Sequence, residues 1–218
     1  MDIGRAQPFV VGLSPPVMLW QMRCLPEREH RVMPWANGRG STMEIATYPS
    51  SVSWAWRISL ADVTEDGAFS ALPGLDRSLV VASGKGMRLT VGEAPPVIIR
   101  MHEHVEFSGD VSVYAHLIDG PVRDLNLMVR RAACLGTPLL DVRGVAKGAE
   151  IALDGAVAIV VLDGALTMTV RSEGFPYSPL RRRVGRFDAV LPDDGVDGRL
   201  VAAVDSVLAF AFLRSECC

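Results

Sequence analysis

Short strand-like segments recur along most of this chain and limit what it can fold into. Each is rich in β-branched or aromatic residues, and Gly, Pro or Asp separates it from the next. In the first part of the chain they are MEIATYP, WAWRISLADV, LVVAS, MRLTV and VSVYAHLID. After Asp141 the pattern returns as AEIAL, AVAIVVL, ALTMTV, AVL and VLAFAFL. Strands of this length at regular spacing predict an all-β protein made of antiparallel sandwiches or barrels.

A short pattern occurs once in each half of the chain. Residues 80–91 read VVASGKGMRLTV and residues 160–170 read VVLDGALTMTV. Each has an apolar strand, a turn glycine (Gly84 or Gly164) and a second strand that ends in Thr-Val, so we expect two similar hairpins. The repetition predicts two copies of one small barrel, packed face to face and joined by the linker DGPVRDLNLMVRRAA. Only FSALPGLD and the region around Leu125 are expected to be helical or looped.

Composition and charge narrow the class of partners. The chain has 218 residues, 49% of them hydrophobic, and a net charge of −3, so we expect neither nucleic acid nor an anionic lipid surface as a partner. No apolar run reaches the roughly 18 residues that a membrane helix needs. The four cysteines have no C-x-x-C spacing, which favours a reducing, cytoplasmic setting.

The glycine-rich stretch NGRGST, which begins at Asn37, is a candidate phosphate loop. A phosphate loop needs a strand before it and a helix after it. Here Pro34 precedes the stretch, and the residues from Met43 to Tyr48 alternate like a strand. The glycines therefore predict a tight bend at a sheet edge rather than a phosphate site.

The segment MHEHVEF is a candidate metal site. In a strand, His102, His104 and Glu106 would share one face, and His116 would arrive from a neighbouring strand. This spacing resembles the metal motif of cupin barrels, although Glu106 follows His104 more closely than that motif requires. The alternative is the polar side of an exposed hairpin, and we expect no metal to be required.

Arg57 is a charged residue within the otherwise apolar strand SWAWRISLADV. Alternation puts Arg57 and Ser59 on one face of the strand and Trp56 and Ile58 on the other. A guanidinium among apolar neighbours needs a partner. Two interpretations stay open: an internal ion pair with Glu44 or Asp124, or an anchor for the carboxylate of a ligand.

Three stretches in the same order resemble the motifs of one protein family, HutD/Ves. They are PWANGRGSTMEI, WRISLADVTEDGAFSALPGLDR and LIDGPVRDLNLMVRR, and the likeness continues more weakly to the end of the chain. The resemblance implies a bicupin, with two jelly-roll barrels in one chain, encoded in bacteria near the genes of histidine degradation. It also implies a non-enzymatic protein that binds a small carboxylate, such as formylglutamate or urocanate, and moderates flux through that pathway.

The family's polar positions supply the candidate ligand-binding residues. Carried over one by one, they fall on Asn37, Thr42, Glu44, Arg57, Ser59, Asp119, Arg123, Asp124 and Asn126. The resemblance implies no cofactor and no catalytic residue.

The resemblance and the pattern of strands together give three parts to the chain. Residues 1–29 are an N-terminal extension, residues 30–131 are the first cupin-like barrel with its linker, and residues 132–218 are the second barrel. The apolar tail VLAFAFL is expected either to complete a core or to form an edge through which two copies dimerise. Two alternative functions stay open: a metal-dependent cupin enzyme that uses His102, His104 and Glu106, and a structural or protein-binding module.

Overall fold

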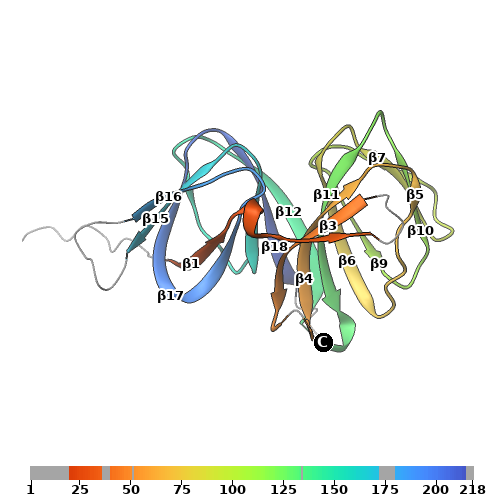
Figure 1. Ribbon diagram of the computed structural model, residues 1–218, viewed down its shortest axis with the longest axis horizontal. Coiled ribbons are helices and arrows are strands. Elements are labelled where there is room, and N and C mark those ends of the chain that lie inside the picture. The colour runs from red at the N-terminus through yellow and green to blue at the C-terminus, as the bar shows by residue number, and fades with distance from the viewer. Residues whose placement is uncertain (1–19, 36–39, 51, 134, 172–179, 215–218) are drawn as a thin grey trace, which may run out of the picture.

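The computed structural model describes residues 20–35, 40–50, 52–133, 135–171 and 180–214. Two lobes of antiparallel strands lie side by side in it (Figure 1). The described residues form strands and two 3-10 turns, η1 (Glu27–Glu29) and η2 (Arg131–Ala133), and no α-helix. The expected all-β class is confirmed. No helix in this part of the chain is long and apolar enough to cross a membrane.

The first lobe contains two sheets. The six-stranded sheet has the order β2 (Arg31–Pro34), β3 (Gly40–Tyr48), β4 (Trp56–Val63), β11 (Val122–Arg130), β6 (Leu75–Ser83) and β9 (His104–Ser108). The four-stranded sheet has the order β5 (Gly67–Ala68), β10 (Val113–Leu117), β7 (Met87–Val91) and β8 (Val97–Ile99).

The second lobe is one strongly bent sheet. Its main order is β12 (Thr137–Val145), β18 (Ser206–Arg214), β14 (Ala158–Asp163), β17 (Ala189–Ala202), β15 (Leu166–Arg171) and β16 (Leu180–Val184). Two further strands pair with β17, namely β1 (Trp20–Leu25) and β13 (Glu150–Ile151). The segment that we assigned to an N-terminal extension therefore supplies a strand to the lobe formed by the C-terminal half of the chain (Figure 1).

Alternation along the strands gives the six-stranded sheet two different faces. Its outward side chains, such as Ile58, Leu60 and Leu127, pack in one buried cluster with Val160 and Ala209 of the second lobe. Burying a side chain of this size contributes about 1.5–3 kcal/mol, so this cluster holds the lobes together. The inward side chains face the four-stranded sheet and leave room for a cavity.

The segment predicted to be a linker is instead β11, the strand between β4 and β6. It includes the region around Leu125, for which we expected a helix or loop, and that expectation was wrong. One side of β11 does lie between the lobes, because Leu125, Leu127 and Val129 belong to the cluster that joins them. The linker between the lobes is the short stretch after Arg130.

The internal repeat corresponds to a repeated strand-to-strand crossing. Gly84 connects β6 to β7 and Gly164 connects β14 to β15, both with positive φ. Neither pair of strands forms the expected hairpin, because the two strands of each pair bond to other strands. A Cβ on Gly84 would lie 2.6 Å from the Pro121 carbonyl oxygen, and one on Gly164 would lie 2.6 Å from the Asp205 carbonyl oxygen. Because both positions lack a Cβ, the connection between the two strands packs closely against the backbone just before another strand. That strand is β11 in the first lobe and β18 in the second.

Replacing Gly84 with alanine should lower the free energy of unfolding by about 3 kcal/mol, because positive φ and a backbone clash act together. Gly148 provides a matched control, since its φ is +84° but nothing lies within 4 Å of an added Cβ. Gly148→Ala should cost only about 1 kcal/mol, for the backbone conformation alone. Urea unfolding of the two variants checks this, and equal losses would contradict the close approach at Gly84.

Candidate functional site

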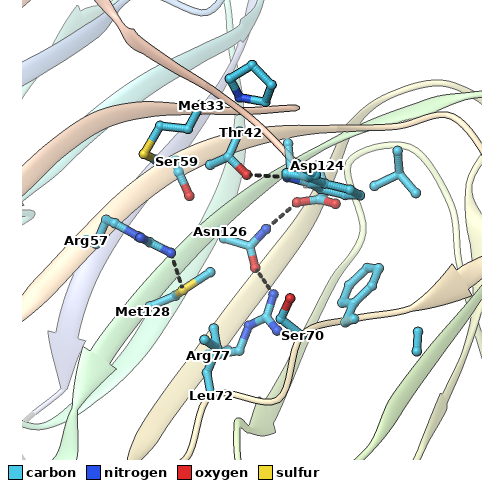
Figure 2. A pocket seen from close by; sticks show the side chains of 16 residues that line it. Met33, Thr42, Arg57, Ser59, Ser70, Leu72, Arg77, Asp124, Asn126 and Met128 are labelled. Atoms are coloured by element: carbon cyan, nitrogen blue, oxygen red, sulfur yellow. Dashed lines mark hydrogen bonds between the residues drawn. The ribbon is translucent and has the colours of Figure 1, made fainter. Parts of the chain in front are cut away.

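A cavity of about 490 Å³ lies on the inward face of the six-stranded sheet (Figure 2). The segment from Ala68 to Leu72 borders it, together with Trp35. Charged and amide side chains line it from three neighbouring strands: Arg57 from β4, Arg77 from β6, and Asp124 and Asn126 from β11. Thr42, Ser59 and Ser70 add hydroxyl groups to the lining. Five of these seven residues were predicted from the sequence; Arg77 and Ser70 were not.

The strand register explains why residues far apart in the sequence meet here. Arg57 on β4 is paired with Met128 on β11, and Met128 is paired in turn with Arg77 on β6. Ser59 and Asn126 form the next pair on the same face. The two arginines therefore stand on either side of Met128, with the amide of Asn126 beside them (Figure 2).

The predicted alternation along β4 is confirmed. Arg57 and Ser59 line the cavity, whereas Trp56 and Ile58 belong to the core between the lobes. The sheet therefore has a polar cavity on one face and the joint between the lobes on the other.

Arg57 has no carboxylate partner among the described residues. Its Nη2 lies 3.4 Å from the Met128 sulfur, its guanidinium stands 5.1 Å from the centre of the Trp54 ring, and its buried Nε has no hydrogen-bond partner in the described part of the chain. Burial lowers the pKa of Arg57 from its usual value. The interpretation of Arg57 as an ion-pair partner of Glu44 or Asp124 finds no such pair among the described residues, although the charge of Glu44 partly opposes the lowering of the Arg57 pKa.

Arg77 is the charged residue of the cavity that the sequence analysis missed. Only 6% of it is exposed, and its Nη2 donates a hydrogen bond to Asn126 Oδ1 at 2.8 Å. The guanidinium lies over the rings of Phe69 and Phe107, at 5.5 and 4.8 Å, and its Nε has no partner among the described residues. Burial lowers the pKa of Arg77 to about 10. The signal was present, since Arg77 interrupts the apolar strand LDRSLVVAS much as Arg57 interrupts its own.

Asp124 is the buried carboxyl group of the cavity. It is 1% exposed, and its Oδ1 accepts a hydrogen bond from Asn126 Nδ2. Burial raises the pKa of Asp124 to about 7 and Asp62 adds to that rise, while Arg77 and the bond from Asn126 oppose it. The cavity thus holds two guanidinium groups and one carboxyl whose charge changes near neutral pH.

Three other predicted residues lie outside the cavity lining. Glu44 is partly buried on β3, with a carboxylate oxygen 4.0 Å from an Arg31 nitrogen. Asp119 is exposed in the turn before β11 and has a positive φ of 54°. Arg123 points toward the Asp62 carboxylate instead. Asn37 lies outside the described residues.

Arg123 joins three parts of the chain. It donates two hydrogen bonds to the Asp62 carboxylate, at 2.7 and 3.0 Å, and one to Glu27 Oε1 at 2.6 Å. Its guanidinium also stands 4.8 Å from the centre of the Phe187 ring in the second lobe. Glu27 follows β1, so Arg123 ties the N-terminal segment and both lobes together.

We expect Arg123→Ala to lower the free energy of unfolding by about 2 kcal/mol, because it leaves the partly buried Asp62 without its partner. The control is Arg199→Ala, which also removes two hydrogen bonds to one carboxylate, that of Glu150, but at an exposed site. The control should barely move the urea midpoint. If the two variants unfold at the same urea concentration, Arg123 is an ordinary surface arginine.

The histidine segment does not form the expected one-faced strand. Strand β9 begins at His104, while His102 lies before it with a φ of +69°. Glu106 forms an ion pair with Arg214, and His116 lies 3.0 Å from Asp66 Oδ2. Among the described residues, no group of three His, Cys, Asp or Glu side chains is placed to hold a metal ion.

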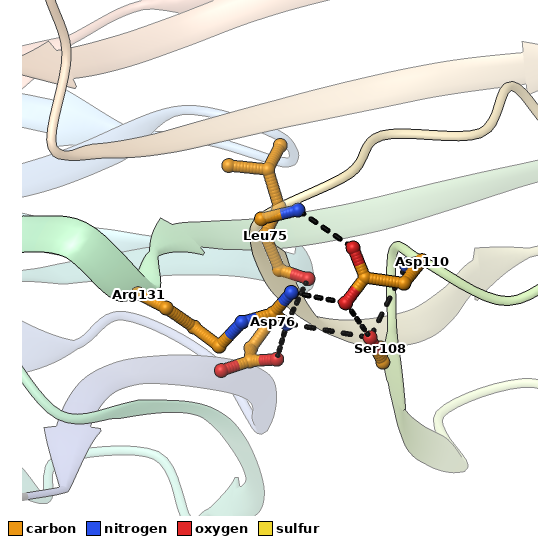
Figure 3. A network of polar contacts seen from close by, with 6 residues as sticks. Leu75, Asp76, Ser108, Asp110 and Arg131 are labelled. Carbon is orange, nitrogen blue, oxygen red and sulfur yellow. Dashed lines mark hydrogen bonds and ion pairs between the residues drawn. The ribbon is translucent and has the colours of Figure 1, made fainter.

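A polar network outside the cavity fixes the segment that borders it (Figure 3). Arg131 pairs with Asp76 at 2.6 Å and also with Asp110. The Asp110 carboxylate accepts a bond from the Gly74 amide at 2.7 Å, and the Leu72 amide donates to the Gly109 carbonyl at 2.9 Å. These bonds hold the wall made by Phe69 to Leu72 against the start of β6.

Known proteins resemble this chain in sequence. The family model described as HutD matches residues 27–204. An uncharacterised 21.2 kDa protein from the hutC 3′ region of Pseudomonas putida is 36% identical over 110 residues, which are 50% of this chain and 58% of that protein. Protein Ves of Cronobacter sakazakii is 38% identical over 101 residues, which are 46% of this chain and 56% of that protein. The matches thus span little more than half the length of these relatives.

Solved structures resemble it over nearly its whole length. A conserved protein of unknown function from Pseudomonas aeruginosa PAO1 has a TM-score of 0.71 and 29% identity, with 90% of this chain and all of that chain covered. HutD from Pseudomonas fluorescens SBW25, in a formate condition, has a TM-score of 0.62 and 25% identity, with 88% and 99% covered. A cupin 2 conserved barrel protein from Leptotrichia buccalis, 14% identical with a TM-score of 0.55 and 87% and 100% covered, shows the cupin fold. Because the family model spans most of its length, the chain belongs to the HutD family.

Proposed function

We propose that this chain binds a small carboxylate in the cavity of its first lobe and acts without catalysis as a modulator of histidine degradation. The ligand is related to that pathway, as formylglutamate and urocanate are. One observation carries the proposal: two guanidinium groups, Arg57 and Arg77, line one cavity, and neither has an ion-paired carboxylate among the described residues.

The electrostatics of the cavity favour an anion. A buried guanidinium is stable only with hydrogen-bond and charge partners. Arg77 has an amide and two aromatic faces, and Arg57 has a thioether and an indole. Within the described part of the chain, the Nε of each arginine has no hydrogen-bond partner. A carboxylate fits the planar fork of a guanidinium with two charge-assisted bonds. A small acid would supply the carboxylate partner that both arginines lack among the described residues.

The names of two relatives support a role in histidine degradation. The Pseudomonas putida relative is described by its place in the hutC 3′ region, and the Pseudomonas fluorescens structure is named HutD. Both names refer to histidine utilisation. The size of the cavity, about 490 Å³, suits a small metabolite better than a peptide or a polymer.

The test is a binding titration of the purified chain with formate, formylglutamate and urocanate, followed by calorimetry and thermal shift. Histamine serves as the control, because it has an imidazole like urocanate but no carboxylate. We expect saturable binding of at least one pathway acid, a higher melting temperature and no effect of histamine. If no acid binds or raises the melting temperature, the protein is a structural or protein-binding module.

A further inference from the structure

The cavity has an acidic end as well as a cationic one. Along β11, Met128, Asn126 and Asp124 point to the cavity in succession. Met128 lies between the two arginines, and a single side chain, Asn126, connects Arg77 with Asp124 (Figure 2). A small acid held at Arg77 would therefore lie near the Asp124 carboxyl.

Asn126 fixes the orientation of this acidic end. Its Oδ1 accepts from Arg77 Nη2 at 2.8 Å, so its Nδ2 faces Asp124 and donates to Oδ1 of the carboxyl. Among the described residues no hydrogen bond reaches the other carboxyl oxygen, Oδ2, and this oxygen is not one of their buried atoms without a partner. Because Asp124 lines the cavity, Oδ2 is the oxygen that is available to a donor of the ligand.

We propose that Asp124 determines which acids the cavity holds. In its ionised form it selects acids that carry an N–H or O–H donor besides the carboxylate, and in its protonated form it also admits acids without a donor. This inference rests on the proposed function, since it concerns the ligand of the same cavity.

The reason is the hydrogen-bond character of the two forms. An ionised carboxylate only accepts, so it binds a ligand donor and repels a ligand oxygen, whereas a protonated carboxyl donates to that oxygen. The charged groups that act on Asp124 are Arg77 from β6 and Asp62 from β4, and Arg57 lines the same cavity. Asp62 stays paired with Arg123. Since burial raises the pKa of Asp124 to about 7, both forms are populated near neutral pH.

The experiment uses two matched pairs of acids: lactate with 2-methoxypropionate, and mandelate with α-methoxyphenylacetate. Each pair differs by replacement of a hydroxyl hydrogen with a methyl group. Dissociation constants are measured by NMR titration at about pH 6 and pH 8, on either side of the Asp124 transition. We expect the wild-type protein to prefer the hydroxy acid by about tenfold or more at the higher pH and by less than about threefold at the lower pH.

Two variants separate a hydrogen bond to Asp124 from simple crowding by the methyl group. In Asp124→Asn the oxygen still faces Asn126 and an amide nitrogen replaces Oδ2, so the preference and its pH dependence should disappear. Asp154→Asn, at an exposed turn of the second lobe, should behave as the wild type. A preference that survives in Asp124→Asn, or equal affinities within both pairs, overturns the inference while binding itself upholds the proposed function. If no acid of either pair binds at about 10 mM, both proposals fail.

Discussion

Arg57→Lys should bind the pathway acid at least about tenfold more weakly than the wild type, a loss of about 1.4 kcal/mol or more. Arg57→Ala should lose only slightly more. An ammonium keeps the positive charge but cannot make two parallel bonds to a carboxylate, so the shape of the guanidinium matters more than its charge. Calorimetric titration of both variants, each first shown to unfold cooperatively, gives the two ratios.

The matched control for this prediction is Arg199→Lys. Arg199 also makes two bonds to one carboxylate, Glu150, but on the second lobe and away from the cavity. The Arg199→Lys variant should bind the acid with the same affinity as the wild type. If Arg57→Lys binds as tightly as this control, Arg57 is not an anchor and the ligand lies elsewhere.

The free energy of unfolding of Asp124→Asn, relative to the wild type, should be about 3 kcal/mol higher near pH 8 than near pH 4. The reason is that the substitution removes a buried charge that the wild type carries only at the higher pH. The folded-state pKa of Asp124 is raised from the ordinary 3.8 to about 7, mainly by burial. Between these values the native protein binds more protons than the unfolded chain. Stability contributed by Asp124 is therefore lost as pH rises through this window, and the full penalty applies above it.

Urea unfolding across this pH range checks the prediction. The stability difference between Asp124→Asn and the wild type should grow steadily from acid to neutral pH and then level off. Asp154→Asn, an exposed aspartate changed in the same way, should follow the wild-type curve. Parallel curves for Asp124→Asn and the wild type would show that Asp124 titrates normally.

The strands and the faces of β4 were predictable from the sequence because both depend on local periodicity. Arg57 and Ser59 were assigned to one face by alternation, and the structure places both in the cavity. The residue types of the glycine-rich stretch and of the strands carried enough information to predict the family and the all-β class.

The features of the site that the sequence did not predict depend on pairing between strands that are distant in the sequence. Arg77 and Asn126 are 49 residues apart and meet only because β6 and β11 are neighbours in the sheet. The central strand β11 was not predicted from the sequence, because Asp124 and Asn126, which line the cavity, interrupt its apolar pattern. Arg123 lies on the same strand but faces Asp62 and the joint between the lobes. A list of polar positions in the sequence cannot reveal this structural role.

The most direct test of carboxylate binding follows the arginine Nε–Hε signals by NMR during titration with the acid. The guanidinium groups of Arg57 and Arg77 line the cavity, so a bound carboxylate should change the environment of both Nε–Hε groups. We predict that these two signals, assigned by Arg57→Lys and Arg77→Lys, shift and saturate together, while the Arg199 signal stays in place. Saturation at other arginines with no change at Arg57 and Arg77 would contradict the account.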